Sequence, residues 1–394
     1  MLDFIKLSSK ISEISMEISE EADIKSKRID RALYTYEKAV ENDILLGEKV
    51  AKYVDIFPWM VGRPLEQLKT KNTLPKLDIT KFTVVSTDGS QIMPSHHEIS
   101  MCYLINVGLI MFTYGTGEKP IQESEPFVFD SDKTLYQTSK KSPSSFSEEV
   151  ISIQRMLKEI EELKNLCKRA KDRGHPVIAI SDGTLINWSI NNQMWSEEYK
   201  DMIMDKFLSI LDEIKLLEVP VCGYISNSRR NDFVNFLRVQ LCPYEEVNCE
   251  KLCSEKEACD SIIPLYDREI WLKKLATGER SPIFASAAKI LEKYKDHQIC
   301  FFYINVGNDE IARIEIPRWV ADNEDNLNLV HFLIYDQVQK GMGYPITIQE
   351  AHNQAVVKNA DRMQFYSILS RKMINNNIKV ALSNKEIKKR GGIA

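Results

Sequence analysis

The stretch FTVVSTDGSQI, residues 82–92, joins a β-branched and aromatic run to an acid followed by glycine. Phe82 to Ser86 has the composition of a buried strand, which runs directly toward Asp88-Gly89. Glycine after the acid lets the backbone turn sharply and leaves the carboxylate at the rim of a sheet. A single Asp-Gly pair after a strand is more often an ordinary turn, because both residues favour turns.

A second copy of this arrangement favours a site over a turn. Residues 177–180, VIAI, form a continuous apolar run of the kind found in a strand covered on both faces, and it leads to Ser181-Asp182-Gly183. A rigid sheet can hold carboxylates close enough to bind two hard cations about 4 Å apart. The sequence therefore predicts Asp88 and Asp182 as metal ligands that serve hydrolysis of a phosphodiester.

A long helix is predicted between the two acids, over residues 147–173, because apolar residues recur there at helical spacing. Several glutamates on this helix compete for the place of a third ligand. We predict Glu159, which borders the apolar stripe beside Met156 and Leu163, and rank Glu162 second. For either residue, the alternative is a solvated glutamate on an exposed helix face.

The order of predicted elements sets the fold class. Residues 99–114 are expected to form two antiparallel strands joined near Asn106 to Gly108, and residues 125–129 a third strand. Antiparallel strands, then a long helix, then a buried strand that ends in an acid is the order found in ribonuclease H-like nucleases. The predicted fold is therefore α/β, a ribonuclease H-like mixed sheet flanked by helices, with an N-terminal helical segment and an irregular insertion.

Three segments follow from this order. Residues 1–78 form an N-terminal helical segment, in which Ile11 begins a series of apolar residues at helical spacing. Residues 79–365 form the nuclease domain, and residues 242–285, less regular and rich in Cys, Glu and Lys, are expected to be an insertion in it. Residues 366–394 form a C-terminal helix and a basic tail.

Four of the eight cysteines lie in or beside the predicted insertion: Cys242, Cys249, Cys253 and Cys259. Four thiolates are able to hold zinc or an iron–sulfur cluster, but these spacings fit no standard knuckle. The alternative, which we favour, is reduced cysteines in an ordinary insertion.

Composition limits the function classes. The chain has 394 residues, 43% of them apolar and 28% charged, with a formal net charge of −5. No overall basic field attracts nucleic acid, so contacts with DNA must come from local Lys and Arg patches. The N-terminus has no secretion-signal pattern, and the apolar run at 102–114 is too short for a spanning helix. We therefore expect no membrane association and a cytoplasmic location.

Two further charged pairs are ambiguous in sequence. Arg229 and Arg230 follow a strand and open a helix, which suits contacts with phosphate, although solvated charges fit equally well. Arg313 and Glu315 alternate with apolar residues, which predicts that both face water on an open side of the sheet. The alternative for Glu315 is a place in the site. The basic tail at 385–390 suits contact with DNA or a partner, or is a frayed terminus.

Five segments carry a specific resemblance. In order, STDGSQI, AISDGTLI, GYISNSR, ARIEIP and DQVQKGMGYPITIQEAH, at 86–92, 179–186, 223–229, 312–317 and 336–352, resemble the successive signature segments of NurA nucleases. The resemblance spans roughly residues 82 to 365. It implies a fold similar to the nuclease domains of ribonuclease H and Argonaute, a manganese requirement, and digestion of DNA ends alongside the hexameric ATPase HerA.

The resemblance also implies roles for single residues. Asp88 and Asp182 match the two family aspartates, and the helix glutamate has a family counterpart whose position the spacing does not fix. Tyr344 and His352 match the tyrosine and the histidine of the terminal motif. His352 would complete a metal site or move a proton near the leaving group. Tyr344 would stack on DNA or orient a phosphate, the alternative being a core aromatic residue.

These inferences give a predicted function: a nuclease that processes DNA ends in repair or defence, with two Mn²⁺ or Mg²⁺ ions. We expect a homodimer docked on a HerA-type hexameric ATPase, since this chain has no phosphate-binding GxxxxGK[ST] loop of its own. The alternative is a catalytically weak DNA-binding adaptor that regulates that ATPase. A nuclease directed at RNA would use the same chemistry and stays open.

Overall fold

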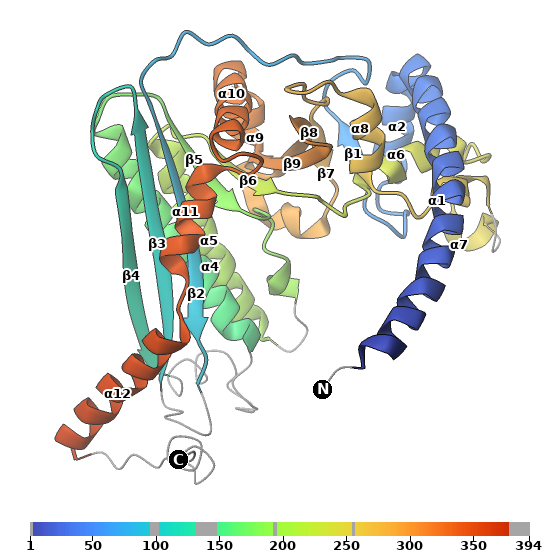
Figure 1. The fold of residues 1–394 in the computed structure, drawn as a ribbon. Helices are drawn as coiled ribbons and strands as arrows, with labels where there is room; N and C mark the ends of the chain where they lie inside the picture. Colours follow the sequence, from blue (N-terminus) through green and yellow to red (C-terminus); the bar gives the residue numbers. More distant parts are fainter. Residues whose placement is uncertain (1–2, 95–101, 131–147, 192–194, 254–256, 378–394) are drawn as a thin grey trace. The chain divides into compact units, whose positions relative to one another are not determined.

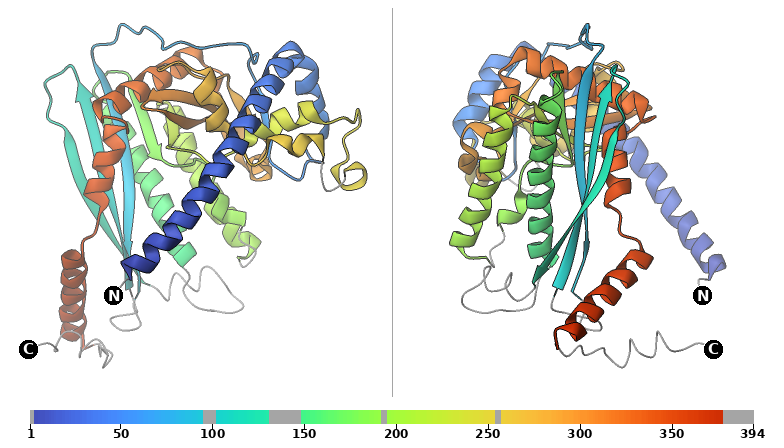
Figure 2. Two further views of the ribbon diagram at one scale, coloured as in Figure 1. Left: turned by 45° about the vertical axis from the view of Figure 1, so that its right-hand side comes forward. Right: turned by 90° about the vertical axis from the view of Figure 1, so that its left-hand side faces the viewer.

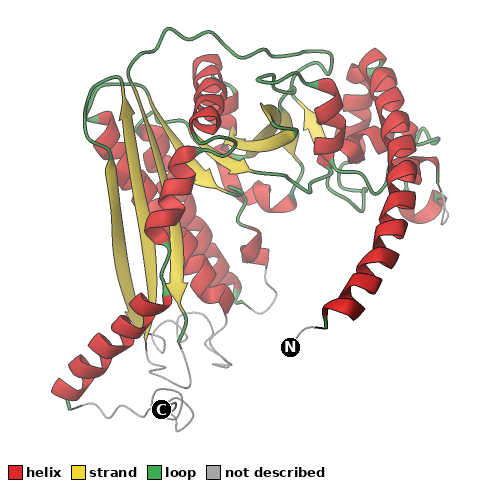
Figure 3. Cartoon of the chain, in the orientation of Figure 1, coloured by secondary structure: helices red, strands yellow, loops and turns green. Residues whose placement is uncertain are grey.

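The computed structural model describes residues 3–94, 102–130, 148–191, 195–253 and 257–377 (Figure 1). The chain forms two compact units. The first comprises residues 1–75, 225–292 and 298–321, and the second comprises residues 76–224, 293–297 and 322–394. Figure 3 shows that each unit combines helices with strands, so the structure belongs to the predicted α/β class.

The second unit contains a mixed sheet in the strand order β6-β5-β2-β3-β4. Its strands are β2 (Phe82–Ile92), β3 (Cys102–Tyr114), β4 (Ile121–Asp130), β5 (Val177–Asp182) and β6 (Val221–Ile225). β5 runs parallel to both β2 and β6, whereas β2, β3 and β4 pair antiparallel. Three antiparallel strands therefore precede the long helix and the strand that ends in Asp182, in the order that the sequence predicts.

Helices cover both faces of this sheet (Figure 2). α4 packs on β2 and β3 from one face and is itself covered by α5, whereas α11 packs on the same two strands from the other face. The helical elements that belong wholly to this unit are α4 (Glu148–Lys171), η1 (Trp188–Asn191), α5 (Glu197–Leu216), α10 (Glu324–Lys340), α11 (Ile346–Ala355) and α12 (Asn359–Asn375). The α4 stripe predicted from sequence is buried, with Ile153, Ile160 and Leu163 inaccessible or nearly so.

The prediction of two strands within residues 99–114 is wrong, because β3 is one continuous strand. Asn106 and Gly108 looked like a turn, but they accommodate helix α11. A Cβ at position 108 would overlap the backbone oxygen of Ala351, and the Asn106 amide donates a 2.9 Å hydrogen bond to the carbonyl of Ala355. Glycine within a strand here marks the close approach of another backbone.

The first unit contains a small antiparallel sheet in the order β1-β7-β8-β9. Its strands are β1 (Gly62–Pro64), β7 (Phe284–Ser286), β8 (Ile299–Gly307) and β9 (Glu310–Pro317). Its helical elements are α1 (Phe4–Glu41), α2 (Asp43–Tyr53), α6 (Asp232–Leu241), α7 (Cys249–Leu252), η2 (Ala258–Ile262), α8 (Asp267–Lys274) and α9 (Arg318–Ala321), while η3 (Lys289–His297) continues into the second unit. Tyr36, Phe233 and Trp271 form an aromatic centre in its core.

The N-terminal segment is helical, as predicted. Only the C-terminal half of α1 is buried in the core of the first unit, through residues such as Ala32 and Ala39, whereas Ile11 is exposed. Residues 242–285 contribute α7, η2 and α8 to the same unit. The assignment of 79–365 to one nuclease domain, with 242–285 inserted in it, stays a prediction.

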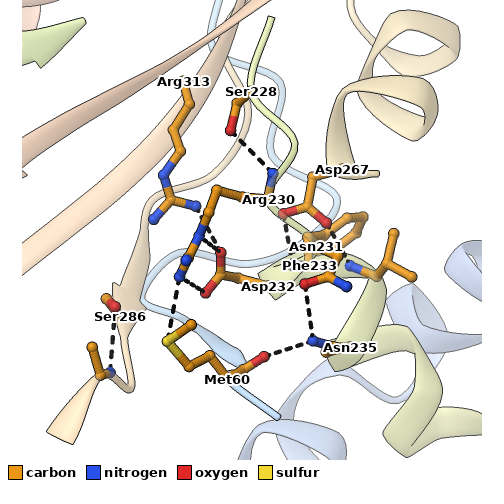
Figure 4. Close-up of polar contacts among 12 residues, drawn as sticks. Met60, Ser228, Arg230, Asn231, Asp232, Phe233, Asn235, Asp267, Ser286 and Arg313 are labelled. Atoms are coloured by element: carbon orange, nitrogen blue, oxygen red, sulfur yellow. Dashed lines mark hydrogen bonds and ion pairs between the residues drawn. The ribbon is translucent and has the colours of Figure 1, made fainter. Parts of the chain in front are cut away.

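The prediction that Arg313 and Glu315 face water is wrong, because α8 covers β9 and both side chains are buried. The Arg313 guanidinium donates to Asp232 Oδ2 at 3.0 Å (Figure 4) and to Glu315 Oε1 at 3.0 Å. Asp267 accepts hydrogen bonds from two backbone amides in the first turn of α6, and burial raises its pKa to about 7. Arg313 and Glu315 therefore belong to a buried ionic network that connects β9 to α6. Charged residues that alternate with apolar ones along a strand usually face water, and that pattern gave the wrong prediction here.

None of the helices in the described ranges combines the length and the apolar character needed to cross a membrane.

Candidate active site

The register between two parallel strands brings the predicted acids together. Thr87 of β2 lies opposite Ser181 of β5, so Asp88 and Asp182 occupy the next position on neighbouring strands. β5 ends at Asp182, and Gly183 then adopts a φ of +83°, a conformation that glycine reaches without steric strain. The sharp turn expected at Gly89 is wrong, because β2 continues through Asp88-Gly89 to Ile92 and Gly89 pairs with Val107 of β3.

Helix α4 supplies the third carboxylate, Glu159. A Cβ at position 89 would overlap Glu159 Oε1 and come within 2.7 Å of Arg155 Cγ, so a side chain there would displace these two side chains from their present positions. The Thr87 hydroxyl also donates a 2.9 Å hydrogen bond to the backbone carbonyl of Glu159. The glutamate is therefore fixed beside the strand that carries Asp88.

The helix position that ranked second is placed differently. Glu162 accepts a hydrogen bond from Asn165, at 3.2 Å, on the exposed side of α4. The choice of Glu159 over Glu162 thus agrees with where the helix directs the two side chains.

The three carboxylates are close enough to perturb one another. Burial raises the pKa of Glu159 to about 7, Arg155 opposes this shift, and the charges of Asp88 and Asp182 add to it. Burial also raises the pKa of Asp182, and Asp88 contributes to that rise. A cation is favoured at this edge, because a positive charge beside Glu159 and Asp182 stabilises their ionised forms.

Tyr344 lies directly on Asp182. Its hydroxyl donates a 2.8 Å hydrogen bond to Asp182 Oδ1, which lowers the pKa of that acid against the effect of burial. The Tyr344 ring packs edge-on against Tyr224 of β6, with centroids 5.4 Å apart. Gly341, where α10 gives way to the turn, has no room for a Cβ because the backbone of Tyr344 folds back over it. Tyr344 is thus half-buried and held beside Asp182. A tyrosine that only filled the core would not need its hydroxyl on this acid.

His352 lies on Asp88. It projects from α11, and its Nδ1 is 2.8 Å from Asp88 Oδ2 while 66% of its side chain stays exposed. α11 is fastened to the sheet by hydrogen bonds from Ser90 and Asn106 to the carbonyl of Ala355. Four elements, β2, β5, α4 and α11, and the turn before α11 therefore place the five predicted catalytic residues in one site.

The donor set suits a hard divalent cation, because carboxylate oxygens and an imidazole are the groups that Mn²⁺ and Mg²⁺ accept. Throughout the described part of the chain, no three Asp, Glu, His or Cys side chains are grouped tightly enough to ligate one ion as they stand. At the acid edge, Tyr344 and His352 each bond to one carboxylate oxygen. An ion would compete with these two hydrogen bonds, whereas the mutual repulsion of the three acids favours its entry.

Arg229 and Arg230 belong to the first unit, whereas the five residues described above belong to the second. Arg229 is exposed, and Arg230 is partly buried, with its guanidinium bonded to both oxygens of Asp232 (Figure 4). Their contact with DNA stays a prediction. The basic tail at 385–390 lies outside the described residues.

The four clustered cysteines are free thiols, and Cys249 and Cys253 interact with each other. The choice between reduced cysteines and a bound metal stays a prediction.

Arg155 is a residue that the sequence did not single out for the site. Its Nε lies 3.2 Å from Glu159 Oε1, and its stem packs over Gly89. The signal was present, since the two residues are one helical turn apart and of opposite charge. Such pairs are common on helix surfaces, so only the position of α4 on β2 distinguishes this one.

Comparisons with known proteins identify the family and the fold of this chain. Residues 82–357 match the sequence model of a family described as the NurA domain. The crystal structure of the NurA nuclease from Sulfolobus solfataricus is 15% identical, with a TM-score of 0.54 over 95% of this chain and 98% of that one. A second NurA crystal structure is 11% identical, with a TM-score of 0.42 over 84% and 95% of the two chains. No curated protein matches. The likeness to the first structure establishes a shared fold.

Proposed function

This chain belongs to the NurA family, and from that premise we propose that it is a metal-dependent nuclease that processes DNA ends. One observation carries the proposal. Two strands and a helix bring Asp88, Asp182 and Glu159 to one edge, where Tyr344 and His352 bond to the two aspartates and the charges of those aspartates help to raise the pKa of Glu159. Structural acids on a sheet rim have no need of such crowding, which raises the free energy of the metal-free fold.

We propose that Asp88, Asp182 and Glu159, with His352 beside them, hold two Mn²⁺ or Mg²⁺ ions. Bound there, the ions would activate water and stabilise the leaving oxygen of a phosphodiester. The pKa of Glu159 is about 7, so part of the metal-free protein carries a proton on this group at pH 7. A bound cation would displace that proton, because a positive charge favours the ionised carboxylate.

The remaining side chains have roles that follow from their contacts. The Tyr344 hydroxyl holds the Asp182 carboxylate in one orientation. His352 keeps its exposed ring nitrogen toward solvent while Nδ1 bonds to Asp88, so it is placed to give a proton to a leaving oxygen. Arg155, which pairs with Glu159, supplies a positive charge for a phosphate oxygen.

The test is digestion of linear DNA with manganese by the parent, by Asp88→Asn and by Asp182→Asn. Each variant removes one charge and keeps the shape, so we expect at least about a hundredfold loss of rate. Glu162→Gln is the matched control and should keep the parent rate, because Glu162 bonds to Asn165 away from the acids. If either aspartate variant digests DNA as fast as the parent, the proposed metal ligands are wrong.

We further propose that the nuclease is a homodimer that works with a HerA-type hexameric ATPase in repair or defence. Family membership supports this, and a net charge of −5 suits an enzyme that receives DNA from a partner better than one that attracts it alone. End-labelled linear and closed circular DNA, with and without the ATPase, test the end requirement and the partner together. Protein that binds ends but cuts none of these substrates with any divalent metal would be an adaptor instead.

A further inference from the structure

A cavity of about 190 Å³ lies behind the acid edge, within the second unit. Glu159 and Ser181 form the wall that it shares with the site. Its other walls are largely apolar and include Met156 and Ile160 of α4, Leu185 of the loop after β5, and Phe207 of α5. Because Ser181 directly precedes Asp182, anything bound in this cavity lies next to one of the acids proposed to hold the metal ions.

One polar side chain in the cavity wall has an unused donor. Asn187 is 8% exposed, and its Nδ2 is buried with no hydrogen-bond partner among the residues that the structure describes. Its position is fixed, because its backbone amide donates a 2.7 Å hydrogen bond to the hydroxyl of the buried Tyr294. Buried polar groups almost always have partners, and an exception at a cavity wall points to a ligand that supplies the acceptor.

We propose that this cavity receives the base of the nucleotide that adjoins the scissile phosphate, an inference that rests on the proposed nuclease function. An engineered cavity of about 150 Å³ is enough to hold benzene, so this one accommodates a planar ring. Apolar and aromatic walls, here Met156, Phe207 and the half-buried Trp188, favour stacking on any base.

The single amide donor also suits a base without selecting its identity. Pyrimidine O2 and purine N3 are acceptors on the same edge of the bases, so one donor from Asn187 Nδ2 serves all of them. The cavity would therefore position a strand by one base and read no sequence. A nuclease that removes successive nucleotides from an end needs this kind of grip.

The test uses DNA ends with the fluorescent base 2-aminopurine at successive positions, bound in calcium under conditions where no cleavage is detected. We expect the protein to protect one position from acrylamide quenching. Asn187→Leu keeps the side-chain shape and removes the amide, so it should weaken that protection and lower affinity for the end by roughly five- to tenfold. Asn165→Leu, on the exposed side of α4 and outside the cavity, should match the parent.

A second variant fills the space without touching the amide. Ser152 lines the cavity from α4, and Ser152→Phe should exclude the base and abolish protection, whereas Asn165→Phe should not. Thermal melting controls for a structural role. Asn187→Leu should melt no lower than the parent, because it replaces an unpaired buried amide with an apolar group. A lower melting temperature would mean that Asn187 supports the fold, and would overturn the proposal.

The outcomes separate this inference from the nuclease function. If ends with an abasic terminal nucleotide are bound and cut as well as normal ends, the base pocket is wrong and the nuclease stands. If protection depends on Asn187 but no divalent metal supports cutting, the pocket stands and the nuclease function is wrong. Protection that is unchanged in both Asn187→Leu and Ser152→Phe would place the base elsewhere and end the proposal.

Discussion

Replacing Glu159 with glutamine should stabilise the metal-free protein and disable its binding of metal. The pKa of Glu159 is about 7 in the folded protein and 4.5 in its ordinary state, so folding hinders ionisation of this group. The hindrance is small below pH 4.5, grows as the pH rises toward 7, and is constant above that. Glutamine keeps the shape of the side chain and never ionises, so it removes this effect.

The size of the effect follows from linkage. A shift from 4.5 to about 7 costs the folded state about 3 kcal/mol at pH 8 and under about 1 kcal/mol at pH 5. The Glu159 side chain keeps 24% of its surface exposed, so solvent relieves part of this cost. We therefore expect Glu159→Gln to raise the free energy of unfolding by about 1–3 kcal/mol at pH 8, and by much less at pH 5.

Urea denaturation in EDTA, followed by circular dichroism at the two pH values, measures this difference. Glu162→Gln is the control, and it should stay within about 0.5 kcal/mol of the parent at both. Adding manganese at about 100 times its Kd should stabilise the parent by about 2.7 kcal/mol and Glu159→Gln by less. If Glu159→Gln is less stable than the parent at pH 8, or gains equally at both pH values, the account of crowded carboxylates is wrong.

Three further substitutions test other parts of the structure. Gly89→Ala should cut the rate of DNA digestion at least about tenfold and reduce stabilisation by manganese, because its methyl group displaces the helix glutamate; a thermal-shift titration measures the second effect. Tyr344→Phe removes the hydrogen bond that lowers the pKa of Asp182, so activity should fall more at pH 6 than at pH 8, which a pH–rate profile would show. Asp267→Ala should destabilise the protein by about 3–5 kcal/mol in urea, because it leaves two buried α6 amides and the Tyr303 hydroxyl without their acceptor.

Asp182 could be predicted as a strand-end acid, because an apolar run that ends in Asp-Gly is readable without any tertiary contact. Asp88 has the same local pattern but lies inside β2, and the parallel pairing of β2 with β5 brings the two acids together. The helix glutamate was harder to choose. Glu159 and Glu162 lie on one helix and share a composition, and what separates them is the direction in which α4 faces β2.

The errors have one physical cause, which is that packing overrode a local pattern. Asn106 and Gly108 have the chemistry of a turn, yet they lie inside a strand because α11 crosses it there. Arg313 and Glu315 alternate as residues that face water do, yet α8 covers them and Asp232 supplies a matching charge. Neither partner lies near these residues in sequence, so no window of the chain contained the answer.

Two glycines inside neighbouring strands explain how the site is assembled from both faces of one sheet. Gly89 lets α4 approach β2 from one side, and Gly108 lets α11 approach β3 from the other. Each helix carries a site residue, Glu159 on α4 and His352 on α11. His352 bonds to the Asp88 carboxylate, and the charge of Asp88 raises the pKa of Glu159. A side chain at Gly108 would meet the backbone of α11, and one at Gly89 would displace the Glu159 and Arg155 side chains of α4. A glycine that lies in a strand next to an acid, or opposite one, therefore indicates that a helix packs there and brings a further site residue. Composition and hydrophobic periodicity alone do not identify such positions.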